Sequence, residues 1–101
     1  MVTHIVWWTF KAEANGKTGP ENAAIVREKL LALRGRIPEL KDMRVSTRLL
    51  DSSTENAELV LVTRHDDAEG LKAYAVHPEH QEIAVFMKEA AASRNAIDFN
   101  E

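Results

Sequence analysis

Three residues able to donate or accept protons lie close together around one proline late in the chain. They are Tyr74, His77 and His80, which fall within seven residues of one another. A neutral imidazole, with an ordinary pKa of about 6.5, accepts a proton at neutral pH. Removing a proton beside a carbonyl needs such a base and a hydrogen-bond donor for the oxyanion that develops. The pattern predicts His80 as the base and Tyr74 as the donor.

The proline between the two histidines sets their directions. Pro78 cannot continue a helix, because it lacks an N–H and its ring clashes with the previous turn, but it suits the first turn of a new helix. We therefore expect one helix to end near Val76 and another to begin at Pro78, with His77 at its N-cap. His80 then shares a helix face with the apolar residues Ile83, Ala84 and Met87. It points inward, either as a core histidine with satisfied hydrogen bonds or as a functional group.

Residues on the predicted strands complete this hypothesis. His4 is a third catalytic candidate, and either His4 or Glu58 can orient the base or the donor. Apolar walls would keep such a site dry, and the residues expected to contact a ligand there are Val6, Trp8, Glu58, Val60, Val62 and His77. The alternatives are structural: His4 as an ordinary strand residue, Glu58 as a strand-edge carboxylate paired with a surface cation, and Trp8 as plain packing.

Composition excludes several classes of function. The 101 residues suffice for one domain, residues 1–101, with 45% apolar and 29% charged residues. A formal net charge of −3 without a basic stripe argues against nucleic acid as a partner. The apolar run near the N-terminus is too short for a membrane span or a secretory signal. The lack of cysteine excludes disulfides and thiolate catalysis. We expect a cytoplasmic protein.

The first part of the chain predicts a strand followed by a capped helix. Residues 2–11 are rich in β-branched and aromatic side chains, and large apolar groups fall on both faces of this strand. Residues 11–19 form a polar loop. Thr18 stands three residues before Glu21 in a capping box and opens a helix that ends near Arg34.

The rest of the chain switches between a strand period of two and helical spacing. Asp66 stands three residues before Glu69 and caps a short helix. The predicted elements are a strand over residues 40–49, a polar turn over 51–56, a strand over 58–65, a short helix over 66–74, a helix over 78–92 and a strand over 94–99.

This order, β-α-β-β-α-β, is that of a ferredoxin-like α+β fold, with a four-stranded antiparallel sheet and helices on one face. The opposite face of the sheet would then be open in a monomer. The strands over residues 2–11 and 58–65 carry apolar groups on both faces, so the open face also needs cover. The sequence therefore predicts a homodimer through the open sheet face.

Five segments together resemble the stress-responsive A/B barrel domain family, also called Dabb. They are the opening VTHIVWWTFK, IPELKDM after the first helix, the strand ELVLVT, the junction AYAVHPEHQ and the closing IDF. The resemblance covers nearly the whole chain and implies a dimeric α+β barrel. Many members of this family have no assigned activity. A plant member is a polyketide cyclase that closes a ring by an aldol-type reaction without metal or nucleotide.

The resemblance to the cyclase also implies site residues. Its histidine after the proline matches His80, its tyrosine one turn before the break matches Tyr74, and its first-strand histidine matches His4. A further histidine at the start of the third strand is replaced here by Glu58, which cannot donate a hydrogen bond while ionised. Trp8 is bulky for a position that lines the pocket.

Three functions of different classes remain open. The first is a homodimer that binds a small hydrophobic or aromatic molecule between sheet and helices without turnover. The second is a cofactor-independent cyclase, isomerase or lyase that uses His80 and Tyr74. The third follows other dimeric α+β barrels, which include haem-degrading monooxygenases, with His77 or His80 as the iron ligand. We expect no cofactor. We also expect no metal, because His77 and His80 diverge in direction.

Overall fold

The computed structural model describes the whole chain, residues 1–101. Six strands and three helices follow one another along the sequence. They are β1 (Val2–Phe10), β2 (Glu13–Ala14), β3 (Lys17–Thr18), α1 (Gly19–Leu31), β4 (Asp42–Ser46), β5 (Leu59–His65), α2 (Ala68–Val76), α3 (Pro78–Ala90) and β6 (Ala91–Asn100).

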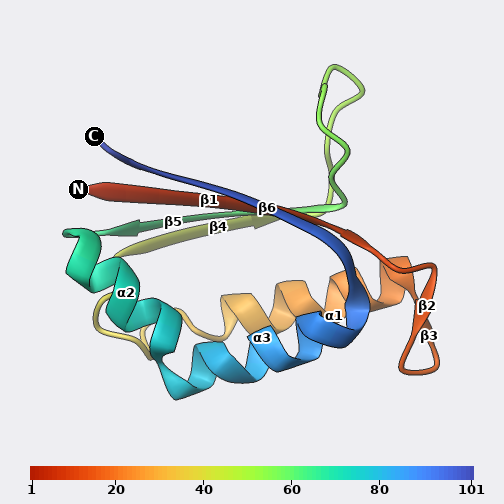
Figure 1. Cartoon of the computed structure of the whole chain (residues 1–101), viewed down its shortest axis with the longest axis horizontal. Coiled ribbons are helices and arrows are strands. Elements are labelled where there is room, and N and C mark those ends of the chain that lie inside the picture. The colour runs from red at the N-terminus through yellow and green to blue at the C-terminus, as the bar shows by residue number, and fades with distance from the viewer.

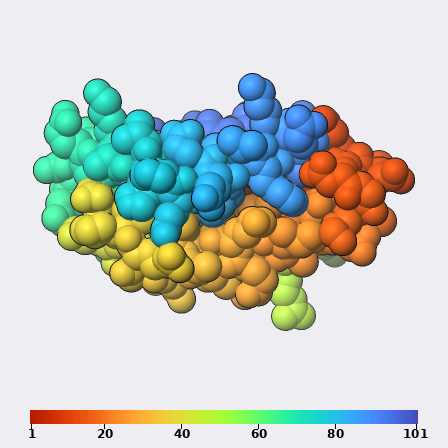
Figure 2. Space-filling model, turned by 90° about the horizontal axis from the view of Figure 1, so that it is seen from below, coloured from red at the N-terminus to blue at the C-terminus, as the bar shows by residue number.

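Four of the strands form one antiparallel sheet in the order β4-β5-β1-β6. All three helices lie on the same side of this sheet (Figure 1). Seen from that side, the surfaces of α1, α2 and α3 cover it (Figure 2). The predicted ferredoxin-like α+β fold is confirmed. None of the helices combines the length and the apolar character needed to cross a membrane.

The first helix begins as predicted and ends sooner. The Thr18 hydroxyl accepts from the Glu21 amide, and the Glu21 carboxylate accepts from the Thr18 amide, so the capping box is present. The helix ends at Leu31 and not near Arg34. Arg34 instead donates its amide to the Leu31 carbonyl, three residues back, so the last turn is tighter than an α-helix.

The junction between the last helix and strand differs from the prediction more clearly. Alanines 91 and 92 favour a helix by intrinsic propensity, yet α3 ends at Ala90. Ala91 has an extended backbone and pairs with Phe10 of β1. Pairing with the long first strand therefore outweighs the local preference, and β6 starts three residues before the predicted Arg94.

Two connections also differ. The predicted loop after β1 contains the small hairpin β2–β3, whose turn residues Asn15 and Gly16 have the positive φ angles that a tight hairpin turn requires. β4 stops at Ser46 and not at residue 49. The segment that follows, residues 47–58, rises from the sheet on the side opposite the helices (Figure 1).

The core lies between the sheet and the helices. Alternate residues of a strand face opposite sides, and on β1 every even-numbered residue is buried, whereas Thr3 is the single buried odd-numbered one. On β5 the odd-numbered residues are the buried ones. The largest fully buried apolar side chains are Tyr74, Leu30, Ile37, Met43, Leu59 and Leu61.

Candidate functional site

A cavity of about 360 Å³ lies between the sheet and α3. Its walls come mainly from β1, α3 and the start of β6, with one leucine each from α1 and β5. The lining residues are His4, Val6, Trp8, Leu30, Leu61, His80, Ile83, Ala84, Met87, Lys88, Ala91, Ala92, Ser93 and Arg94. Most are hydrophobic, so the cavity suits an apolar or aromatic molecule.

His80 faces this cavity from the first turn of α3. Its Nδ1 lies 3.0 Å from the carbonyl oxygen of Ala75, near the end of α2. A carbonyl only accepts hydrogen bonds, so Nδ1 carries the proton and donates it. The Nε2 atom of the neutral ring is left with a free lone pair. His80 is therefore held in the tautomer that a general base at the cavity requires.

The protonation of His80 follows from its surroundings. Burial lowers the pKa of this imidazole below its usual value, because the charged form loses hydration. The hydrogen bond to Ala75 opposes this shift, whereas the positive charges of His4, Arg94 and His77 add to it. With a lowered pKa, His80 is neutral at pH 7 and able to accept a proton.

His4, the third catalytic candidate, also lines the cavity, and it has a partner that the sequence analysis missed. Its Nδ1 hydrogen-bonds to the carboxylate of Asp98, which lies directly opposite on β6. This bond orients the ring and leaves Nε2 for a ligand. Only the register between β1 and β6 brings these two residues together.

Tyr74, the predicted donor, lies beside His80 but does not line the cavity. Its ring packs between those of His65 and His80, with centroid distances of 5.0 and 4.5 Å. Its hydroxyl is buried without a hydrogen-bond partner. Burial raises the pKa of this phenol far above its usual value, so Tyr74 stays protonated. Its contact with a ligand stays a prediction.

His65, which the sequence analysis did not propose for the site, packs its ring against that of Tyr74. Its Nδ1 donates to the carbonyl oxygen of Glu39 at 2.8 Å, and its Nε2 accepts from the Thr63 hydroxyl at 2.9 Å. Both nitrogens are thus satisfied in a fully buried side chain. Burial lowers the pKa of His65. It is a core histidine behind Tyr74.

Of the predicted apolar walls, Val6 and Trp8 line the cavity, whereas Val60 and Val62 do not. Residues that face each other in an antiparallel pair project to the same side of the sheet. Val6 pairs with Leu61. Val60 and Val62 therefore lie on the open side of the sheet, and their sequence-based placement in the pocket is wrong.

Glu58 is outside the cavity too. It precedes β5, its side chain is exposed, and its carboxylate accepts from the Phe10 amide at 2.8 Å. Its own amide donates to the carbonyl of Trp8 at 2.8 Å. Glu58 thus extends the pairing of β1 with β5. It orients neither His80 nor Tyr74, and its partner is a backbone amide and not a surface cation.

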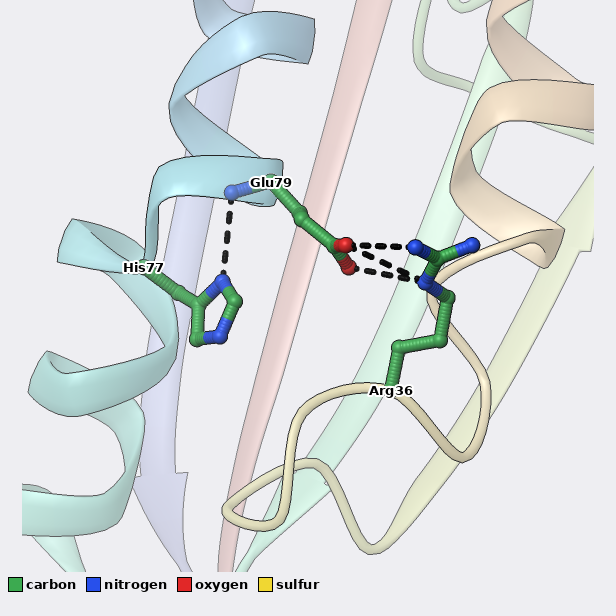
Figure 3. Close-up of polar contacts among 3 residues, drawn as sticks. All are labelled: Arg36, His77 and Glu79. Carbon is green, nitrogen blue, oxygen red and sulfur yellow. Dashed lines mark hydrogen bonds and ion pairs between the residues drawn. The ribbon is translucent and has the colours of Figure 1, made fainter.

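His77 serves the helix and does not line the cavity. Its Nδ1 accepts from the Glu79 amide at 3.1 Å, which makes it the N-cap of α3 (Figure 3). Glu79 in turn forms a two-pronged ion pair with Arg36. Of the two histidines considered as iron ligands, only His80 faces the cavity. No group of three or more His, Asp or Glu side chains is arranged to hold a metal ion.

Over residues 2–101 the chain matches the family described as the stress responsive A/B barrel domain, Dabb. None of the curated proteins compared with it matches. The family that the sequence resembles is thus also the one that the whole chain matches.

Solved structures share the fold over nearly the full length. A dimeric ferredoxin-like protein of unknown function from Thermobifida fusca is 26% identical, with 99% of this chain and 90% of that chain covered and a TM-score of 0.81. A hydroxynitrile lyase from Passiflora edulis is 16% identical (99% and 94% covered, TM-score 0.79). SnoaB, a cofactor-independent oxygenase from Streptomyces nogalater, is also 16% identical (99% and 91% covered, TM-score 0.74). The two enzymes share only the fold with this chain.

Proposed function

The chain belongs to the stress-responsive A/B barrel domain family, and we propose that it forms a homodimer whose protomers each bind a small hydrophobic or aromatic molecule between sheet and helices. The observation that carries this proposal is the cavity of about 360 Å³ with its largely hydrophobic lining. Trp8 supplies an aromatic wall and Met87 an adaptable one. A small aromatic molecule fits a space of this size and character.

The homodimer is supported by the open face of the sheet. Ile5 pairs with Val62 on one side and Ile97 on the other, so these three apolar side chains lie next to one another there. Ile97 and the nearby Phe99 are 52% and 44% exposed. A second copy, sheet face to sheet face, would remove this surface from water. The relative from Thermobifida fusca is described as dimeric.

A thermal-shift screen with a blocked cavity tests the binding proposal. The panel holds phenols, aromatic ketones, β-keto acids and haemin, because ligands that bind only the folded state raise the melting temperature. Ala84→Trp fills the cavity from an exposed position of α3, and Val85→Trp is its control, since Val85 is 68% exposed and lies outside the lining. We expect hits that stabilise the wild type and Val85→Trp but not Ala84→Trp.

Two results would count against this reading of the cavity. Equal stabilisation of Ala84→Trp would place the ligand elsewhere on the protein. A Soret shift with haemin that disappears in His80→Ala would favour the haem-binding alternative.

A second candidate function is favoured by the tautomer of His80. With Nδ1 bonded to Ala75, the free Nε2 can remove a proton from a carbon next to a carbonyl. Such a base would serve a cofactor-independent cyclase, isomerase or lyase. The two enzymes of similar fold are named a hydroxynitrile lyase and a cofactor-independent oxygenase. At 16% identity these names carry no chemistry over, so the proposal rests on His80 itself.

Hydrogen–deuterium exchange separates binding from proton transfer. In D₂O, a base at the cavity takes a proton from the methyl group of bound 4-hydroxyacetophenone, and the enolate then takes a deuteron from the solvent-exchanged base. Loss of the methyl NMR signal should be about 10²–10⁴ times slower in His80→Gln than in the wild type. Equal rates in the two proteins, with binding retained, would leave only the binding function.

A further inference from the structure

Two cations border the cavity and have no partner in the chain. Lys88 comes from the last turn of α3 and Arg94 from β6, and both belong to the lining. Neither side chain forms a hydrogen bond or an ion pair within the protein. No Asp or Glu side chain is part of the lining. The cavity therefore carries unbalanced positive charge.

The register of the sheet sets the backbone of Arg94 apart from that of His4. Arg94 lies directly opposite Trp8 in the pairing of β6 with β1, whereas His4 lies opposite Asp98, four residues along each strand. Four strand residues span roughly 13 Å. The backbone of Arg94 thus lies beside Trp8 and apart from that of His4, while the charge of Arg94 is close enough to His80 to lower the pKa of that imidazole.

The two cations of the lining are suited to a carboxylate. A guanidinium binds a carboxylate through two parallel hydrogen bonds, and these are stronger than bonds between neutral groups. The hydration lost by the carboxylate is offset where two cations line the same cavity and no acidic side chain in the lining competes. The adjoining indole of Trp8 offers a flat surface for an aromatic ring.

We propose that the natural ligand is an elongated aromatic or aryl-keto acid whose carboxylate is held by Arg94 and Lys88, with its reacting end at His80. This proposal rests on the binding function proposed above and names the class of molecule bound. It makes Arg94 the residue that selects acids over neutral compounds. His80 lines the same cavity, where a ketone of the same molecule can meet the Nε2 atom.

Matched acid and amide pairs test this proposal by calorimetry. We choose 4-acetylbenzoate and 4-acetylbenzamide, with two longer aromatic pairs, because a carboxamide keeps the shape of the acid and removes its charge. The wild type should bind at least one acid about tenfold or more tightly than its amide. Arg94→Gln should lose this preference and keep its affinity for the amide. Lys88→Gln should reduce the preference, and higher salt should weaken binding of the acid only.

Lys72→Gln is the charge-matched control, since Lys72 is an exposed residue of α2 outside the lining. It should keep the full preference for the acid. Light scattering of Arg94→Gln should show the same mass as the wild type, which separates loss of the ligand site from loss of a subunit contact.

Three outcomes would overturn the inference. If acids and amides bind the wild type equally, the cavity binds small molecules without selecting acids, and only the binding function survives. If no member of any pair binds, the acid-selecting site is ruled out, and the thermal-shift screen with its wider panel decides the binding function by itself. If Arg94→Gln and Lys72→Gln lose the preference to the same extent, the effect comes from net charge and not from a site at Arg94.

Discussion

The two faces of the four-stranded sheet are built from the same strands and differ in how they are covered. On the face toward the helices, Val6 and Leu61 are each 1% exposed and Leu59 is fully buried. On the other face, Ile97 remains 52% exposed and Phe99 44%. A single chain buries the apolar residues of the first face, whereas it leaves those of the second face partly exposed to solvent.

The difference suggests that the two faces of the sheet serve different functions. His4 and His80 line a space on the helix side, and His65 lies in the core beside it. Burial keeps His65 and His80 neutral and strengthens the electrostatic interactions around them. The open face carries no histidine in any of its four strands. We therefore expect chemistry on the helix side and subunit contacts on the open side.

The sharpest contrast is expected between two neighbouring residues of β5. Leu59→Ala removes a fully buried side chain on the helix face and should lower the free energy of unfolding by about 2–5 kcal/mol. Val60→Ala changes the open face, so its effect should act through the dimer and shrink as the protein is diluted. Urea unfolding at several protein concentrations measures both. Equal losses that do not depend on concentration would contradict the comparison.

A charged side chain introduced on the open face should convert the dimer to a monomer and leave the fold of the protomer intact. Ile97→Glu changes a side chain that a single protomer leaves half exposed, so the protomer itself should tolerate it. Buried against a second sheet, the unpaired carboxylate would be costly. Light scattering should give about twice the chain mass of 11.3 kDa for the wild type and the single chain mass for the variant.

The control for this experiment is Val85→Glu, at an exposed position of α3. It should remain dimeric, because α3 lies on the helix side. A wild-type protein that is monomeric at micromolar concentration would remove the homodimer from the proposal.

Acid should lower the stability of the protein through the buried histidines on the helix side. The pKa values of His65 and His80 are lowered in the folded protein, so the unfolded chain binds more protons as the pH falls through about 6.5. Stability is then complete above that pH and declines toward the lowered values. The melting temperature should fall between about pH 7 and pH 5, and fall less in His80→Gln. A melting temperature that rises on acidification would contradict this.

The smallest effect is expected at the outer surface of the helix side. The side chains of Arg36 and Glu79 are 63% and 32% exposed, so their ion pair is largely screened by water. Arg36→Gln should cost about 0.2–1 kcal/mol, and less at high salt. Urea unfolding at low and high salt measures the loss. A loss as large as that of Leu59→Ala would show that the link from the segment after α1 to the start of α3 (Figure 3) matters as much as the core.

The features predicted correctly all depend on near neighbours in the chain. Thr18 and Glu21 are three residues apart, and their capping box forms as expected. Pro78 separates two helices and leaves His77 as the N-cap of the second. The family and the ferredoxin-like fold were also predictable, because the order of strand and helix patterns is itself a sequence property.

The errors about the site concern residues brought together from distant parts of the chain. Val60 and Val62 were placed with Val6 and Trp8, although each strand taken alone shows only that its residues alternate. Which residues of β5 share a sheet face with Val6 and Trp8 depends on the register of β1 with β5. This register pairs Val6 with Leu61. The partnership of His4 with Asp98 spans almost the whole chain and left no local signal.

The sequence by itself determined the order of the main elements, the caps of α1 and α3, the break at Pro78 and the inward direction of His80. Each of these follows from the geometry of a few adjacent residues. The cap of α2 is Asp67, which accepts from the Gly70 amide, and not the predicted Asp66. Tertiary structure alone decided which strand faces meet, that Asp98 orients His4, and that Arg94 and His80 line one cavity. Those relations depend on strand register, which many weak contacts along the whole sheet settle together, so no single segment of the chain contains them.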